Sequence, residues 1–265
     1  LSLEWSRLEP EQGAWSQAAV DRYRQILIFL RDHGLTPMVT LHHFTLPLWA
    51  ADQGGWENER SVGWFTRYVE LCYDALGDLC NLWCTINEPL VYAVYGYLFG
   101  LWPPGRGGLR AMRRVVRNQA HAHASAYEAI HWRQADALVG YATHLRIFDP
   151  ASNRWPDRAA AALTDHVFNQ CELQAFRDGT LLFPFGWGSA LRTGPKEKLI
   201  DFIGLNYYSR DMVALDLRRP RDLFLRRFAN PNGPYSMDGW GEIYPEGLYR
   251  SLLRMGQEGV PVYIT

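Results

Sequence analysis

The amino-acid sequence predicts an α/β fold, specifically a barrel of parallel strands, and three observations support this class. Strand-like and helix-like segments alternate six times, which is typical of a parallel sheet with right-handed crossovers. Polar side chains follow four of the strands at their carboxyl ends, and a barrel brings all such ends to one mouth, whereas an open sheet does not. The length of 265 residues also suits one barrel domain, which commonly has about 250.

Six segments rich in apolar and β-favouring residues are predicted as strands. They are residues 1–5, 37–41, 81–86, 137–143, 202–205 and 261–265. The third of them is apolar on both faces, as expected for a strand buried inside a parallel sheet. Pro89 cannot extend a central ladder, so this strand must end at or near Glu88.

Five helices are predicted between the strands from apolar residues at helical spacing. They span residues 16–34, 61–77, 109–134, 156–176 and 245–257. Ser16 and Ser61 are the expected N-caps of the first two, and Gly34 and Gly77 supply their stops. The long basic segment 210–240 is expected to be a solvated excursion above the barrel.

Glu88 is the candidate around which the mouth of the barrel is organised. An acidic side chain at the carboxyl end of a buried parallel strand lies where α/β barrels place catalytic groups. The alternative for an isolated glutamate at a strand end is a cap or an ion pair. Further polar residues share this end of the sheet and favour the catalytic interpretation: Arg7, His43, Asn87, Asn206 and Tyr208.

Composition and charge exclude several classes of protein. A formal charge of −1 gives no electrostatic argument for a nucleic acid or an anionic membrane. No apolar run of 18 residues and no basic-then-apolar leader occurs, so neither a membrane span nor secretion is predicted. The 11 Trp, 14 Tyr and 12 Phe supply rings for packing and for stacking on sugars or other planar ligands.

The cysteines and histidines predict no metal site. The four cysteines show no CxxC pairing, and three of them fall in apolar patterns typical of buried, reduced thiols, which favours the cytoplasm. His121 and His123 are two residues apart on a predicted helix, so they point to different sides and lack the spacing of helical metal pairs. No metal and no organic cofactor is expected.

Seven segments in order along the chain resemble glycoside hydrolase family 1, the β-glucosidase and β-galactosidase family. They are LSLEWSRLEP at 1–10, GAWS at 13–16, TLHHFTLP at 40–47, GGW at 54–56, TINEP at 85–89, DFIGLNYYS at 201–209 and IYPEGL at 243–248. The resemblance implies a (β/α)8 barrel, of which residues 1–265 supply strands two to seven as a single partial glycosidase domain.

The resemblance implies catalytic roles for three residues. Glu88 would be the general acid that protonates the leaving oxygen and then the base that activates water in retaining hydrolysis of β-O-glycosidic bonds. Arg7 and Tyr208 resemble the pair that keeps the nucleophilic carboxylate ionised and oriented.

Substrate-binding roles follow from the same resemblance. Asn87 would hydrogen-bond the sugar 2-hydroxyl, His43 matches the sugar-binding histidine, and Asn206 would support this set. Trp56 and Trp102 are further candidates for sugar stacking. The implied partner is a small-molecule β-glycoside or a short oligosaccharide, whereas the preferred sugar and the oligomeric state are not readable from the sequence.

One half of the reaction is not represented in the sequence. In this family the nucleophile is a glutamate in an Ile-Thr-Glu-Asn-Gly run, and Ile264 and Thr265 match only the start of that run. A retaining glycosidase needs two carboxylates, so we expect residues 1–265 alone to be inactive, and to fold poorly because an unclosed barrel exposes two strand edges. The alternative function is a non-catalytic sugar-binding or structural barrel derived from the family.

Overall fold

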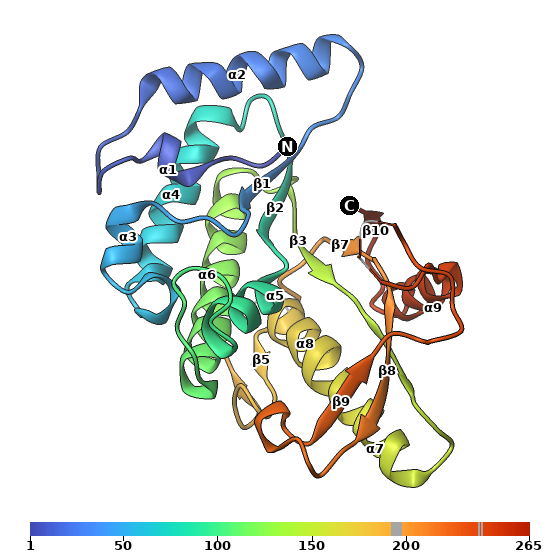
Figure 1. The fold of residues 1–265 in the computed structure, drawn as a ribbon. Helices are drawn as coiled ribbons and strands as arrows, with labels where there is room; N and C mark the ends of the chain where they lie inside the picture. The colour runs from blue at the N-terminus through green and yellow to red at the C-terminus, as the bar shows by residue number, and fades with distance from the viewer. Residues whose placement is uncertain (192–197, 238, 240) are drawn as a thin grey trace.

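A parallel sheet forms the centre of the computed structural model, which describes residues 1–191, 198–237, 239 and 241–265. Its strand order is β1-β2-β3-β7-β10, and every neighbouring pair is parallel. The bounds are β1 (Met38–His42), β2 (Leu82–Asn87), β3 (Leu138–His144), β7 (Phe202–Asn206) and β10 (Val262–Ile264). The predicted alternation and the parallel pairing are confirmed (Figure 1).

The predicted first strand is shorter than expected. Ser2 forms one parallel bridge with Thr40 of β1, and the amide of Leu3 donates to the carbonyl of Thr40 at 2.8 Å. The chain then turns into the short helix α1 (Trp5–Leu8). The sheet therefore continues past β1 by one short segment, and Arg7 lies on a helical turn.

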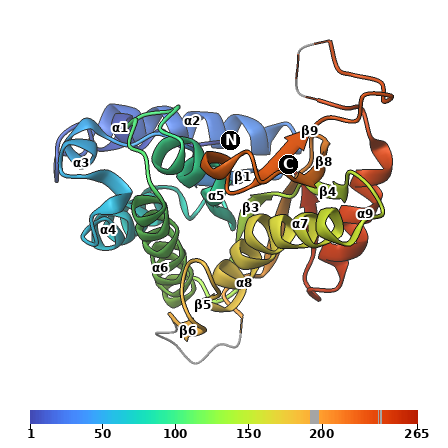
Figure 2. The same cartoon turned by 60° about the horizontal axis from the view of Figure 1, so that its bottom comes forward.

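Helices cover the outside of the sheet. They include α2 (Gln17–Asp32), α3 (Leu48–Asp52), α4 (Ser61–Leu76), α5 (Pro89–Ala93), α6 (Leu109–Arg133), α7 (Trp155–Asp165), α8 (Cys171–Asp178) and α9 (Pro245–Gly256). Figure 2 shows α4, α6 and α8 side by side in chain order. Their inward faces are apolar and join the core of the sheet through residues such as Phe65, Val115 and Phe176, all fully buried.

Two predicted details of the helices differ from the structure. Ser16 caps α2 as expected, since its hydroxyl accepts from the amide of Ala19 at 3.3 Å. Ser61 is instead the first residue of α4, and Arg60 is the N-cap. The helix predicted over 156–176 is interrupted by a π-helical turn, His166–Gln170, between α7 and α8.

Most of the described residues within 210–240 are exposed or partly exposed, as the sequence predicted, but the segment also forms strands. It contributes β8 (Arg210–Leu215) and β9 (Leu225–Phe228), which join β4 (Ile147–Pro150) in a second sheet of order β4-β8-β9. Val213 of β8 is fully buried against Phe148 and the alanines of α7. The sequence did not predict β8, because the basic residues of β9 and of the connecting turn dominate the composition of the segment. Residues 238 and 240 lie outside the described residues.

The remaining short elements lie on the surface of this framework. Strands β5 (Thr180–Leu181) and β6 (Ser189–Ala190) form an antiparallel pair. All four cysteines, Cys72, Cys80, Cys84 and Cys171, are buried and free, whereas the sequence predicted this for three of them. Within the described part of the chain, no helix combines the length and apolar character that crossing a membrane requires.

Candidate active site

Glu88 lies at the carboxyl end of β2, where the sheet gives way to α5. Its backbone is left-handed, with φ of 45°, a conformation that costs free energy for a residue with a Cβ. Its amide donates to the carbonyl of Ala142 on β3 at 2.7 Å, and Pro89 opens α5 directly afterwards. The side chain is 5% exposed, so neighbouring strands hold this carboxyl group inside the sheet's mouth.

Asn206, at the end of β7, forms the strongest contact with Glu88. Its Nδ2 donates to Glu88 Oε1 at 2.6 Å and to Asn87 Oδ1 at 3.2 Å. Its Oδ1 accepts from the Thr265 hydroxyl at 2.6 Å. Because Thr265 occupies the carbonyl side of the amide, the NH₂ group is directed toward Glu88 and Asn87.

His43 joins the same network from the end of β1. Its Nε2 lies 3.3 Å from Asn87 Nδ2, and its Nδ1 lies 2.8 Å from the Ser2 hydroxyl. Burial lowers the pKa of His43, which favours a neutral ring able to accept from Asn87. The structure therefore places His43, Asn87, Glu88 and Asn206 in one hydrogen-bonded chain.

The environment of Glu88 favours its protonated form. Burial raises the pKa of Glu88, while the hydrogen bonds from Asn206 and Tyr208 act in the opposite direction. Its hydrogen-bond partners are thus a neutral amide and a phenol rather than a cation. A carboxyl group whose pKa is raised in this way keeps its proton to a higher pH than an exposed glutamate does.

Arg7 and Tyr208 are placed differently from each other. The Tyr208 hydroxyl lies 3.5 Å from Glu88 Oε1, and its ring meets His144 edge to face at 4.9 Å. Arg7 is exposed on α1, and no hydrogen bond or ion pair joins it to Tyr208 or Glu88 in the described ranges. The structure thus brings Tyr208 to the Glu88 carboxyl group, and the predicted role of both Arg7 and Tyr208 toward a second carboxylate stays a prediction.

The structure does not support the predicted sugar-stacking role of Trp56. Trp56 is fully buried, and its Nε1 donates to His42 Nε2 at 3.0 Å. A ring face that solvent cannot reach offers no platform for a sugar. Trp102 is partly exposed and stacks on Tyr95 at 4.8 Å, with Phe44 at 5.3 Å, and Phe44 in turn contacts the ring of His43.

Three further polar residues reach this region without having been predicted. The Ser2 hydroxyl bonds to His43, and the Thr265 hydroxyl bonds to Asn206. The position of Thr265 directly after a strand was an available signal, whereas Ser2, in an isolated bridge, offered none. Glu172 of α8 is buried and accepts from the amide of Leu90 in α5. Its signal was a charged residue among buried apolar positions of a helix.

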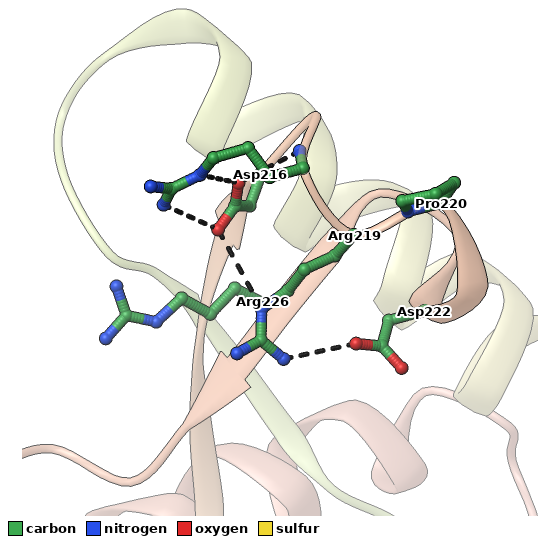
Figure 3. A pocket seen from close by; sticks show the side chains of 6 residues that line it. Asp216, Arg219, Pro220, Asp222 and Arg226 are labelled. Carbon is green, nitrogen blue, oxygen red and sulfur yellow. Dashed lines mark hydrogen bonds and ion pairs between the residues drawn. The ribbon is translucent and has the colours of Figure 1, made fainter.

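A hollow of about 750 Å³ at the β8–β9 turn is a different kind of surface. It is lined by Asp216, Arg218, Arg219, Pro220, Asp222 and Arg226, as Figure 3 shows. Asp216 binds Arg218 at 2.8 Å, and Asp222 binds Arg219 at 3.1 Å. Opposite charges pair with each other here, and none of these residues contacts Glu88. In the described residues, no three His, Cys, Asp or Glu side chains are grouped to hold a metal ion.

The sequence of this chain is similar to the sequences of known glycosidases. The model of glycosyl hydrolase family 1 matches residues 1–265. A 1,4-beta-D-glucan glucohydrolase of Thermotoga neapolitana is 33% identical, and beta-glucosidase A of Thermotoga maritima is 34% identical, each over 100% of this chain. The chain spans 64% and 61% of those proteins.

Solved structures of β-glycosidases also resemble the structure of this chain. A beta-glycosidase from Pyrococcus horikoshii superimposes with a TM-score of 0.89 at 35% identity, covering 100% of this chain and 60% of that one. The beta-glucosidase from Thermotoga maritima in complex with glucoimidazole gives 0.84 at 31% identity, with coverage of 100% and 61%. The parallel sheet is accordingly part of a (β/α)8 barrel, and the chain belongs to glycosyl hydrolase family 1.

Proposed function

We propose that this chain carries the acid/base half of a retaining β-glycosidase of the β-glucosidase type. The observation that carries the proposal is the position of Glu88, a carboxyl group buried at a strand end whose hydrogen-bond partners are an amide and a phenol. A structural glutamate at such depth would require a cationic partner to stay ionised. Glu88 instead has surroundings that keep a proton available.

In the first step, the Glu88 carboxyl group transfers its proton to the glycosidic oxygen as the bond from that oxygen to the anomeric carbon breaks. The anomeric carbon bonds to a second carboxylate and forms a glycosyl ester. In the second step, the Glu88 carboxylate takes a proton from water, whose oxygen attacks the anomeric carbon and releases the second carboxylate.

Asn87 and His43 are proposed to bind the sugar. Asn87 holds its side chain between Asn206 and His43, so its amide is oriented before substrate arrives. A hydrogen bond from this amide to the sugar 2-hydroxyl would strengthen as positive charge develops at the anomeric carbon.

The second carboxylate is proposed to follow Thr265 directly in the encoded protein. Thr265 donates its backbone amide to the carbonyl of Leu205 at 3.1 Å and its hydroxyl to Asn206. A residue after Thr265 would therefore emerge beside the strand end that holds Asn206 and Tyr208. Retaining enzymes separate their two carboxyl groups by about 5 to 5.5 Å, and a neighbouring strand end suits that spacing.

The proposed substrates are small β-glycosides or short oligosaccharides, consistent with a role in carbohydrate metabolism. The Thermotoga maritima relative binds glucoimidazole, and we propose that this compound also occupies the mouth of the present barrel. Four buried cysteines without a disulfide support a reducing, cytoplasmic location.

The test compares residues 1–265 with the polypeptide extended to include the residues after Thr265, called the extended polypeptide below. We expect the extended polypeptide to hydrolyse aryl β-glucosides and residues 1–265 to show no turnover. In the extended polypeptide, Glu88→Gln should lower turnover of glucosides with poor leaving groups by about 10²-fold to 10⁴-fold. Glucosides with activated leaving groups should keep a normal first step, measured as the burst of released phenol.

Glu246→Gln is the matched control, because Glu246 is exposed in the first turn of α9 and should leave turnover unchanged. Equal losses on poor and activated leaving groups in Glu88→Gln would contradict the acid role. Glucoimidazole binding without any hydrolysis by the extended polypeptide would favour the alternative, a sugar-binding barrel. Robust hydrolysis by residues 1–265 alone would contradict the need for a second carboxylate.

A further inference from the structure

Glu172 is a buried carboxyl group that the proposed reaction does not use. It lies on α8, is 1% exposed, and its Oε2 accepts the backbone N–H of Leu90 at 3.1 Å. The Thr143 hydroxyl also interacts with this carboxyl group, although Oε1 has no partner of ordinary hydrogen-bond geometry in the described chain. Burying such a group is costly, and an apolar side chain would fill a helix–sheet interface at lower cost, so packing alone does not account for Glu172.

The contact with Leu90 supports the segment that carries Glu88. Leu90 is the second residue of α5, which begins immediately after Glu88. The first N–H groups of a helix have no partner within the helix, and the Glu88 side chain, although at the N-cap, does not cap α5. Glu172 supplies that acceptor from a different helix, 82 residues further along the chain.

Glu88 needs such support because its own backbone is strained. A φ of 45° at a non-glycine residue persists only where surrounding contacts over-determine it. Two contacts made by Glu88 itself are its amide to Ala142 and its carbonyl accepting from Tyr92 at 3.2 Å. The Glu172 contact is the third, and it fixes the first turn of α5 against α8.

The protonation state of Glu172 is compatible with this position. Burial raises the pKa of Glu172 to about 8, and the charge of Glu88 acts in the same direction, whereas the hydrogen bonds from Thr143 and from the Leu90 amide oppose this shift. Glu172 therefore stays neutral while Glu88 alternates between its acid and base forms. A neutral carboxyl group still offers a carbonyl oxygen as acceptor to Leu90.

We propose that Glu172 is a positioning residue for Glu88: by accepting the Leu90 N–H, it anchors the helix that follows Glu88 and so fixes the direction of the Glu88 carboxyl group. The inference rests on the proposed acid/base function. General acid catalysis depends on hydrogen-bond geometry at the leaving oxygen, so a displaced α5 would harm proton transfer more than it harms sugar binding.

The experiment uses three variants of the extended polypeptide and aryl β-glucosides whose leaving groups differ in acidity. Glu172→Leu removes the acceptor, Glu172→Asp keeps a carboxyl group but withdraws it by one methylene, and Glu172→Gln keeps an acceptor at the same reach. We expect the Leu and Asp variants to lose about tenfold or more in kcat for poor leaving groups, and about twofold or less for dinitrophenyl glucoside. The Gln variant should match the unsubstituted protein.

Each other outcome has a distinct meaning. Equal losses across all leaving groups, or no loss in the Asp variant, would overturn the positioning role. If the Leu variant does not fold, the Asp and Gln variants still decide between these results. Amide hydrogen exchange at Leu90 should be faster in Asp than in Gln, and equal rates would also overturn the proposal. Absence of hydrolysis by the unsubstituted extended polypeptide would instead remove the proposed function itself.

Discussion

Carboxyl groups at the mouth of the barrel and carboxyl groups on the outer β4-β8-β9 sheet have opposite electrostatic surroundings. At the mouth, Glu88 and Glu172 are buried beside neutral donors, and burial raises the pKa of each. On the outer sheet, Arg210 binds Glu242 at 2.7 Å and Asp149 at 2.9 Å. Hydrogen bonds from Arg210 hold the pKa of Glu242 below its ordinary value.

This difference separates a group that can exchange a proton from one that cannot. A carboxylate beside an arginine stays ionised across the physiological range, because losing the charge would also lose the ion pair. A buried carboxyl group beside an amide can change state at moderate cost. Burial without a cation therefore selects Glu88 and Glu172 as groups able to change protonation state, and of the two it is Glu88 that lies at a strand end beside Asn87 and His43.

Removing the cation from the outer sheet should produce the largest effect on stability. Arg210→Met would leave Glu242, whose side chain is 3% exposed, and Asp149 short of a partner, and leaving a buried charge uncompensated is strongly destabilising. We expect the midpoint of thermal unfolding of the extended polypeptide to fall by several degrees. Arg218→Met is the control, because its pair with Asp216 is exposed and exposed pairs contribute little. Equal midpoints for the two variants would contradict the contrast.

The buried carboxyl group of Glu172 should make the stability of the protein depend on pH. The pKa of Glu172 is raised to about 8 in the fold, so its contribution is present below the ordinary glutamate value and is lost as pH rises through about 8. We expect the free energy of unfolding in urea, taken relative to that of Glu172→Gln, to fall between about pH 5 and about pH 8. His42, His123 and His144 act in the opposite direction below the ordinary histidine value, because burial lowers their pKa to about 3, about 4 and about 3. Their contribution is the same in both proteins, so the comparison with Glu172→Gln removes it.

The contribution of Asp216 to stability should change with pH in the opposite direction to that of Glu172. The hydrogen bond from Arg218 lowers the pKa of Asp216 to about 2, so any contribution is present above its ordinary value and is lost in acid. Asp216→Asn should leave the pH dependence of the free energy of unfolding unchanged between about pH 5 and about pH 8. If Asp216→Asn abolished the fall in the free energy of unfolding over this interval, the assignment of that fall to Glu172 would be wrong.

The smallest predicted effect is a shift in the pKa of Glu88 when its hydrogen bond from Asn206 is removed. This bond favours the ionised form of Glu88, so Asn206→Ala should raise the pKa of the Glu88 carboxyl group. A carbon-13 NMR titration of the labelled side chain in the extended polypeptide measures this shift. Thr265→Val is the graded comparison, because it removes only the bond that orients the amide, and should shift the pKa in the same direction by less. A fall in the pKa in Asn206→Ala would contradict the geometry.

The sequence predicted the sheet and most of the site for a common reason. Apolar runs ending at a polar residue or a proline report both the strand and its carboxyl end, so Glu88, Asn206 and His43 could be placed at one mouth before any coordinates. The β8 strand was not predicted, since a surface sheet alternates polar and apolar residues weakly. Trp56 was misjudged because an aromatic residue in a loop motif does not reveal whether its ring faces solvent or the core.

The amino-acid sequence by itself determined the alternation of the five central strands with helices, the family, and the identity of the candidate acid at the end of β2. Only the tertiary structure decided that Asn206 and Thr265 direct an amide at that acid and that Glu172 supports the helix after it. The physical reason is range: periodicity and strand ends are local properties of the chain. A hydrogen bond between residues 82 or 118 positions apart exists only after the parallel strands and their helices have packed.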